Sequence, residues 1–118
     1  SFILASGSLK QSLGMLQGLT VNTDRMRENL SNGGGLLMAE AVMMGLSPKI
    51  GRKKAHDLVY ATAGDATDNG ITLRQALLAN KEVMLHLTLG DIDRLLDPVN
   101  YTGTAGAMVD SVLKKATQ

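Results

Sequence analysis

The sequence contains no cysteine and no tryptophan, and aromatic residues make up only 3% of its 118 residues. The absence of cysteine excludes disulfides and thiolate-ligated zinc sites, and it fits a reducing compartment. The scarcity of aromatic residues, together with few runs of β-branched residues, favours packed helices over a sheet. We therefore expect an all-α fold with six or seven helices and no sheet.

A strong net charge is also missing. The formal net charge is +1, and the basic and acidic residues are interspersed along the chain. No basic stripe indicates nucleic-acid binding, and no acidic tract indicates a disordered tail. No apolar run reaches the ~20 residues that a bilayer-spanning helix needs, and no signal peptide is visible. We predict a cytoplasmic protein with no nucleic-acid partner and no membrane partner.

The most apolar stretch of the sequence is Leu36–Leu46. Its only charge is Glu40, and apolar side chains cover every side of the helix, which predicts the most buried element of the fold. Because a buried carboxylate requires a cation, we expect Glu40 to form a structural ion pair with Arg25 or Arg27. A general acid or base with a raised pKa is the alternative. We expect the helix to break at Ser47-Pro48, since a residue before proline avoids the α region.

A run of three glycines, Gly33, Gly34 and Gly35, precedes this apolar helix. Ser31 or Asn32 can cap the helix through its side-chain oxygen. A glycine-rich turn at a helix N-terminus can hold an anion, but the GxGxxG spacing and a preceding strand are missing. A tight turn where two helices approach closely is the simpler interpretation. We keep Asn32, Gly33, Gly34 and Gly35 as the candidate group facing a site.

Capping signals divide the rest of the chain into helices. Asn22 can cap a short helix through Leu30, and Gly51 opens a long amphipathic helix that stops at Asn69-Gly70. The apolar stripe of that helix comprises Ala55, Leu58, Val59, Thr62, Ala63 and Ala66. Further starts are predicted at the capping box Thr72–Gln75, at Asn80, at Thr88 with Asp91, and at Thr104, with stops at Ala79, His86, Asp97-Pro98 and Ala116.

The residues offer no visible catalytic constellation. His56 lies beside the apolar stripe, where a hydrogen-bonded structural histidine is usual, and His86 ends a short helix. Neither has a second metal ligand at helical spacing, and no nucleophile elbow or carboxylate pair is present. We expect Tyr101 to anchor the last helix through its hydroxyl. The prediction for this chain is therefore no catalytic residue, no metal and no cofactor.

The chain begins SFILASGSLK, without Met and without a helix-start signal. We expect it to enter in mid-helix, as one domain of a longer protein. Residues 1–17 carry a helical apolar stripe, but their many Gly and Ser residues make a poor isolated helix. Neighbours in its own chain or in partner subunits are expected to order this segment.

Three segments together resemble the C-terminal domain of the fumarase/aspartase superfamily. They are residues 18–46, 50–59 and 95–113, and within the superfamily they are most similar to the 3-carboxy-cis,cis-muconate cycloisomerases. The resemblance implies an L-aspartase-like fold, with residues 1–17 as the end of a central-bundle helix and residues 18–118 as the C-terminal helical domain. It also implies a homotetramer, in which each active site collects residues from three subunits and from the rest of the parent chain.

The resemblance implies that the parent enzyme lactonises 3-carboxymuconate, a small tricarboxylate, in the degradation of aromatic compounds, without metal or organic cofactor. Family catalysis uses a serine in a mobile loop of the type GSSxMPxKxNP. Ser47-Pro48-Lys49 does not match that loop, so the catalytic residues are expected outside this chain. Two alternatives stay open: an adenylosuccinate lyase-type enzyme that releases fumarate, and a stand-alone helical interaction module.

Overall fold

The computed structural model describes residues 2–117, which form eight α-helices and two 3-10 helices and contain no strand. The all-α prediction is confirmed, but the expected count of six or seven helices is too low for residues 2–117. The elements are α1 (Phe2–Gln17), α2 (Thr23–Ser31), η1 (Leu36–Met38), α3 (Ala39–Ile50), α4 (Arg52–Asp68), α5 (Leu73–Ala79), α6 (Lys81–Met84), α7 (Leu89–Leu96), η2 (Pro98–Asn100) and α8 (Ala105–Ala116).

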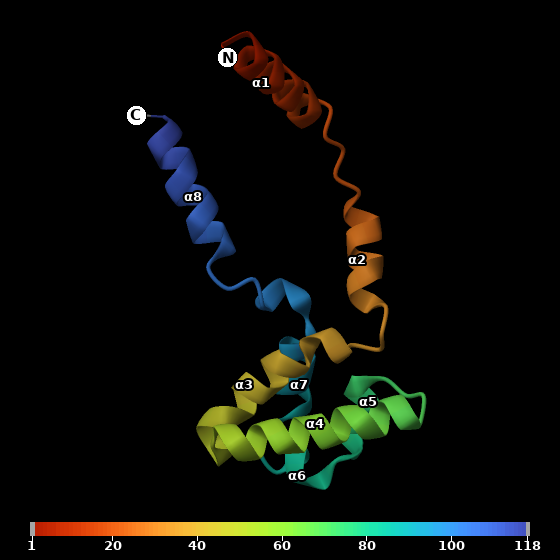
Figure 1. Ribbon diagram of the computed structural model, residues 1–118. Helices are drawn as coiled ribbons and strands as arrows, with labels where there is room; N and C mark the ends of the chain where they lie inside the picture. The colour runs from red at the N-terminus through yellow and green to blue at the C-terminus, as the bar shows by residue number, and fades with distance from the viewer. Residues whose placement is uncertain (1, 118) are drawn as a thin grey trace.

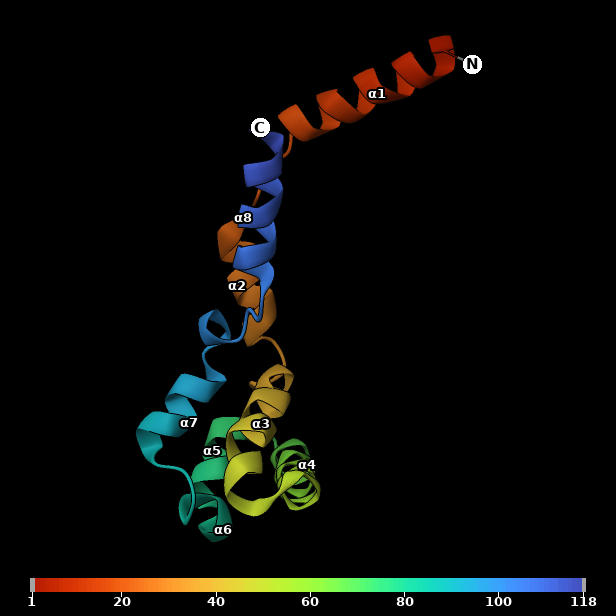
Figure 2. The same ribbon diagram turned by 90° about the vertical axis from the view of Figure 1, so that its left-hand side faces the viewer.

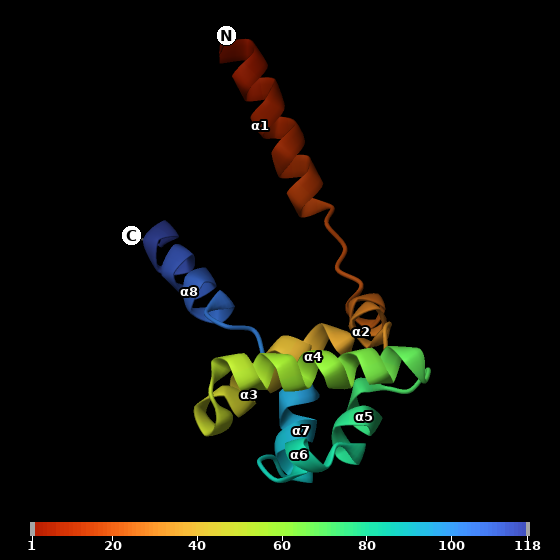
Figure 3. The same cartoon turned by 60° about the horizontal axis from the view of Figure 1, so that its bottom comes forward.

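The molecule consists of a packed core and helices that project from it. Helices α3 to α7 form the core, while α1, α2 and α8 extend from one side of it (Figures 1 and 2). The outer ends of α1 and α8 lie far from the core (Figure 3). No residue of α1, α2 or α8 is buried. Within residues 2–117, these three helices therefore have no buried tertiary packing to stabilise them.

The dimensions confirm how open the chain is. Its radius of gyration is 20.5 Å, whereas a compact domain of this length has about 13–14 Å. Its accessible surface is 9140 Å², whereas a compact protein of this mass exposes about 6,200 Å². About 3,000 Å² of surface is thus left that a compact monomer would bury. No helix within residues 2–117 has the length and apolarity of a membrane span.

The core sits where α3 crosses α4 and α7 and where α5 and α6 close the far side (Figure 1). Its centre is made of buried aliphatic side chains from five different helices and the loop after α6. The amphipathic stripe predicted for α4 is confirmed, since its members are buried or half-buried. The buried cluster comprises Val42, Leu46, Ala55, Val59, Leu73, Leu77, Val83, Leu87 and Ile92.

Most predicted helix starts are confirmed by their capping hydrogen bonds. The Asn22 side chain accepts from the Arg25 amide at 2.9 Å. Capping boxes begin α5 at Thr72 and α7 at Thr88, each with the reciprocal bond from the third helical residue. Asn80 caps α6 by accepting from the amides of Glu82 and Val83, and Thr104 is the N-cap of α8 without a side-chain bond.

The predicted break at Ser47-Pro48 is wrong, because α3 runs through Pro48 to Ile50. The proline removes one amide near the end of the helix, where the acceptor it would have used, on the exposed Met44, can bind water. The helix ends instead at Gly51, whose φ of 84° few other residues adopt and whose amide donates to the Ser47 carbonyl at 2.9 Å.

The start of the apolar helix also differs from the prediction. Ser31 is the last residue of α2 and Asn32 is its C-cap, so neither caps the following helix. A 3-10 turn precedes α3, and in it Leu37 is 63% exposed while Val42 of α3 is fully buried. The apolar residues at Leu36–Leu46 thus divide between the core and the surface. The prediction that all sides of this helix are buried is wrong.

Candidate functional site

The candidate turn at Gly33–Gly35 lies between α2 and the 3-10 turn η1. All three glycines have positive φ values of 98°, 64° and 86°, in the left-handed region that L side chains rarely adopt. The carbonyl of Gly34 accepts a hydrogen bond from the Leu73 amide at 2.8 Å. A Cβ on Gly34 would lie 3.5 Å from the Cα of Thr72. The turn therefore brings the backbone against the beginning of α5.

These contacts give the turn a structural purpose. The Leu73 amide is one of the unpaired donors at the start of α5, and Gly34 satisfies it. The amides of Leu36 and Met38 donate to the carbonyls of Gly33 and Gly35, at 3.2 Å and 3.0 Å. Two amides that an anion would need are thus already bonded. The positive φ values of the turn explain the glycines, and their role in facing an active site, with Asn32, stays a prediction.

Glu40 does not form the predicted ion pair. It lies exposed in the first turn of α3, and within residues 2–117 no cation lies within ion-pair distance of it. Arg25 pairs instead with Glu28 on its own helix at 2.9 Å. Arg27 is exposed on α2 as well. The prediction failed because it assumed that every side of the apolar helix is buried, whereas the side that bears Glu40 is open.

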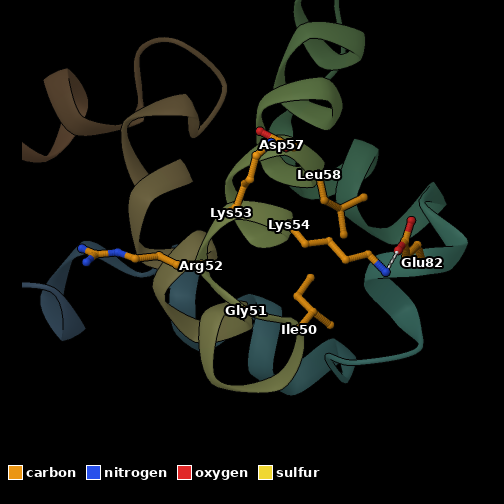
Figure 4. A pocket seen from close by; sticks show the side chains of 8 residues that line it. All are labelled: Ile50, Gly51, Arg52, Lys53, Lys54, Asp57, Leu58 and Glu82. Carbon is orange, nitrogen blue, oxygen red and sulfur yellow. Dashed lines mark hydrogen bonds and ion pairs between the residues drawn. The ribbon is translucent and has the colours of Figure 1, made fainter.

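A shallow basin of about 640 Å³ surrounds the start of α4, between α3, α4 and α6. Three consecutive cations, Arg52, Lys53 and Lys54, line it, but they point apart (Figure 4). Lys54 pairs with Glu82 at 2.8 Å, and Lys53 pairs with Asp57 at 3.4 Å. Two of the three cations therefore form separate surface ion pairs, Arg52 points away from them, and the three do not converge on one anion.

These ion pairs lower the pKa values of both carboxylates, Asp57 and Glu82. Hydrogen bonds from His56 and Lys53 lower the pKa of Asp57, and the hydrogen bond from Lys54 lowers the pKa of Glu82. Both carboxylates stay ionised at neutral pH and are poor proton donors there. The basin thus has no group tuned for acid–base catalysis.

The other residues singled out from the sequence are the two histidines and Tyr101. His56 is exposed; its Nδ1 lies 3.2 Å from Asp57 and its ring stacks on Tyr60 with centroids 6.1 Å apart. The backbone carbonyl of His86 accepts from the ammonium of Lys49. Tyr101 is 47% exposed, and only its backbone amide is seen to bond, so the expected hydroxyl anchor is not found among the described residues. Across residues 2–117, no group of three His, Asp or Glu could hold a metal ion.

Sequence reasoning missed one feature. A second groove of about 330 Å³ lies between α3 and α4, and Glu40, His56 and Tyr60 line it together. On α4, His56, Tyr60 and Ala63 follow the spacing i, i+4, i+7 of one helix face. That spacing was available in the sequence, but the buried stripe beside it carried the stronger apolar signal.

The sequence profile of the family described as adenylosuccinate lyase C-terminus matches residues 35–112, which is more than half of the chain. The chain belongs to this family. Members of the adenylosuccinate lyase C-terminus family stand within the fumarase/aspartase superfamily, as the resemblance implied. One relative is the 3-carboxy-cis,cis-muconate cycloisomerase of Pseudomonas aeruginosa, 42% identical over 93% of this chain and 24% of its own length.

Two crystal structures share the fold of this family member. The fumarate lyase from Mesorhizobium sp. BNC1 is 50% identical, with a TM-score of 0.87 over 93% of this chain and 26% of its own. The β-carboxy-cis,cis-muconate cycloisomerase from Acinetobacter calcoaceticus sp. ADP1 is 34% identical, with a TM-score of 0.87 over 95% of this chain and 26% of its own. These scores over nearly the whole chain mean that related proteins share the open arrangement of projecting helices.

This chain spans about a quarter of the length of the curated relatives that it matches. It therefore corresponds to one part of larger lyase-type enzymes, their C-terminal helical domain. That relation explains both the exposed apolar helices and the lack of a catalytic constellation among the described residues.

Proposed function

We propose that this chain is the C-terminal domain of a 3-carboxy-cis,cis-muconate cycloisomerase. The parent enzyme would lactonise 3-carboxymuconate in aromatic degradation: a carboxylate oxygen adds across a conjugated double bond, and the neighbouring carbon takes up a proton. No atom leaves the substrate, so the reaction is an isomerisation.

The observation that supports this proposal is the likeness to cycloisomerases over nearly the whole chain. The Pseudomonas aeruginosa enzyme is 42% identical over 93% of it, and the Acinetobacter structure covers 95%. The same segments, 18–46, 50–59 and 95–113, carry the resemblance in the sequence itself. The match runs through the core helices and is not confined to one short motif.

In the parent enzyme we assign this chain a positioning role. Residues 1–17 would be the end of a central-bundle helix, and residues 18–118 the helical domain that closes over the end of the bundle. The apolar faces of α1 and α8 would then pack against the remainder of a cytoplasmic homotetramer. A displacement of ~1 Å far from the reacting atoms can cost ~100-fold in rate, so such a domain affects turnover without touching substrate.

The test is to express the full-length parent protein and follow the loss of the conjugated-diene absorbance of 3-carboxymuconate. We expect the substrate to be consumed with formation of a lactone, and the purified 118-residue chain alone to be inactive. Lactone formation by the isolated chain would contradict the assignment of the catalytic residues to the remainder of the parent.

A fumarate-releasing lyase is the second candidate. The fumarate lyase from Mesorhizobium sp. BNC1 supports it, because at 50% identity it is more similar to this chain than the Acinetobacter cycloisomerase is. Adenylosuccinate is the first substrate to test, since the matching family is named for its lyase. Release of fumarate from adenylosuccinate, with no lactone formed from 3-carboxymuconate, would move the assignment to this candidate.

A further inference from the structure

The groove between α3 and α4 has the composition of a docking surface. Ala39 and Met43, one turn apart on α3, form one wall, and His56, Tyr60 and Ala63 on α4 form the other. The small alanines on both walls let a third helix approach the floor closely. At about 330 Å³, the groove is at the low end of ligand-pocket volumes, so it suits a few side chains of a packed helix.

The wall of the groove formed by α4 carries an exposed aromatic residue, Tyr60. Tyr60 is 75% exposed, although it directly follows the buried Val59 on α4. Its ring lies nearly parallel to that of His56, with an interplanar angle of 9°, so the two rings form a flat surface at the rim. Exposed tyrosines presented on rigid elements are frequent anchors of interfaces.

The charge at the rim indicates what the occupant carries. Glu40 lines the groove, and within residues 2–117 no cation lies within ion-pair distance of it. Other core acids do have such cations: Asp57 at 3.4 Å, Glu82 at 2.8 Å and Asp93 at 2.6 Å. Asp65 and Asp68 also lack one, but they lie at the solvent end of α4 and outside the groove.

We propose that the α3–α4 groove binds a helix from the part of the parent polypeptide outside residues 1–118, with an arginine or lysine of that helix paired to Glu40. An apolar groove with a single unpaired carboxylate complements an apolar helix face with a single cation. The relatives are long enough to contain such a segment, since about three quarters of their length lies outside the match. The inference rests on the chain being a domain of a longer lyase-type enzyme, and not on which substrate that enzyme takes.

Photo-crosslinking in the full-length parent tests the proposal. Tyr60 is replaced by p-benzoylphenylalanine, and the crosslinked peptide is identified by mass spectrometry. Lys81, exposed on α6 and outside the groove, receives the same replacement as a matched control. We expect Tyr60 to crosslink to a helical peptide from outside residues 1–118 that contains Arg or Lys, with at least tenfold higher yield than Lys81.

The charge is tested by combining the crosslinker with Glu40→Lys. We expect at least a tenfold loss of the crosslink, whereas Asp68→Lys, an equal change of charge outside the groove, leaves it unchanged. A crosslink to a peptide within residues 1–118 would assign the groove to a second copy and overturn the proposal. So would a yield no higher than that of Lys81, or a crosslink that tolerates Glu40→Lys. Lactonisation is assayed separately, so a wrong substrate and a wrong occupant give different results.

Discussion

The side-chain amide of Asn80 donates to the buried hydroxyl of Thr62 at 2.9 Å and ties the α5–α6 corner to the middle of α4. Thr62 is only 1% exposed, and its hydroxyl donates a hydrogen bond to the Leu58 carbonyl at 2.8 Å. The side-chain oxygen of Asn80 caps α6 by accepting hydrogen bonds from the backbone amides of Glu82 and Val83. One side chain thus starts a helix and fixes it to the core.

We predict that Asn80→Ala lowers the free energy of unfolding by about 1–3 kcal/mol, because it removes a cap and leaves the buried hydroxyl of Thr62 without a donor. The control is Asn69→Ala, which removes one exposed bond to the Asp65 carbonyl and is expected to cost less. Urea unfolding followed by circular dichroism measures both. Equal losses for the two variants would contradict the role assigned to the Asn80–Thr62 bond.

Core packing predicts a contrast between two apolar residues of the same segment. Val42 is fully buried, so Val42→Ala should cost about 2–3 kcal/mol through lost transfer energy and the cavity left behind. Leu37 is 63% exposed, so Leu37→Ala should change stability by less than about 0.5 kcal/mol in the 118-residue chain. A larger loss for Leu37→Ala under identical urea unfolding would mean that this surface is covered in solution.

The ion pair between α5 and α7 predicts a dependence on pH. The Arg74 Nε lies 2.6 Å from Asp93, and the hydrogen bond from Arg74 lowers the pKa of Asp93. Because the folded-state pKa is depressed, the stabilisation is present above the unfolded value of about 3.9 and is lost as pH falls through the folded pKa. Both side chains are nearly half exposed, so the contribution is small and decreases with salt.

Arg74→Gln should therefore flatten the acid limb of the stability curve between about pH 4 and the folded pKa of Asp93. Stability as a function of pH, measured at low and at high salt, checks this. The control is Lys53→Gln, which removes a pair within α4 that links no two helices. A curve for Arg74→Gln that overlays the wild type at low salt would be the contrary result.

The sequence predicted well what neighbouring residues decide. The capping boxes at Thr72 and Thr88 and the cap at Asn22 depend on bonds within three residues, so residue type alone was enough. Prediction from the sequence failed where the structure depends on contacts between residues that are far apart in the chain. Neither the open side of α3 at Glu40 nor the exposure of α1 and α8 follows from periodicity, because an apolar stripe does not say whether its partner lies in the same chain.

The end of α3 is an intermediate case. Proline near the end of a helix is a common signal for a break, but Gly51, three residues after Pro48, is a better one, because its positive φ ends α3 before the chain enters α4. As for the site, the sequence located the glycine turn. It could not say whether the turn faces substrate, since the catalytic residues are expected elsewhere in the parent.

The last prediction concerns Gly34. Its φ of +64° disfavours any Cβ, and a Cβ there would be in van der Waals contact with the Thr72 backbone at 3.5 Å, where α5 begins. In the full-length enzyme, Gly34→Val should therefore lower turnover of the tricarboxylate substantially more than Lys53→Ala, on the exposed face of α4.

Gly33→Ala separates strain from contact, because Gly33 is equally left-handed at +98° but has no heavy atom within 4 Å of the Cβ position. Left-handed strain alone costs roughly 1–2 kcal/mol, which urea unfolding of both glycine variants measures. If Gly34→Val, corrected for the folded fraction, turned over substrate as fast as Lys53→Ala, the turn would only join α2 to the core and would not face the active site.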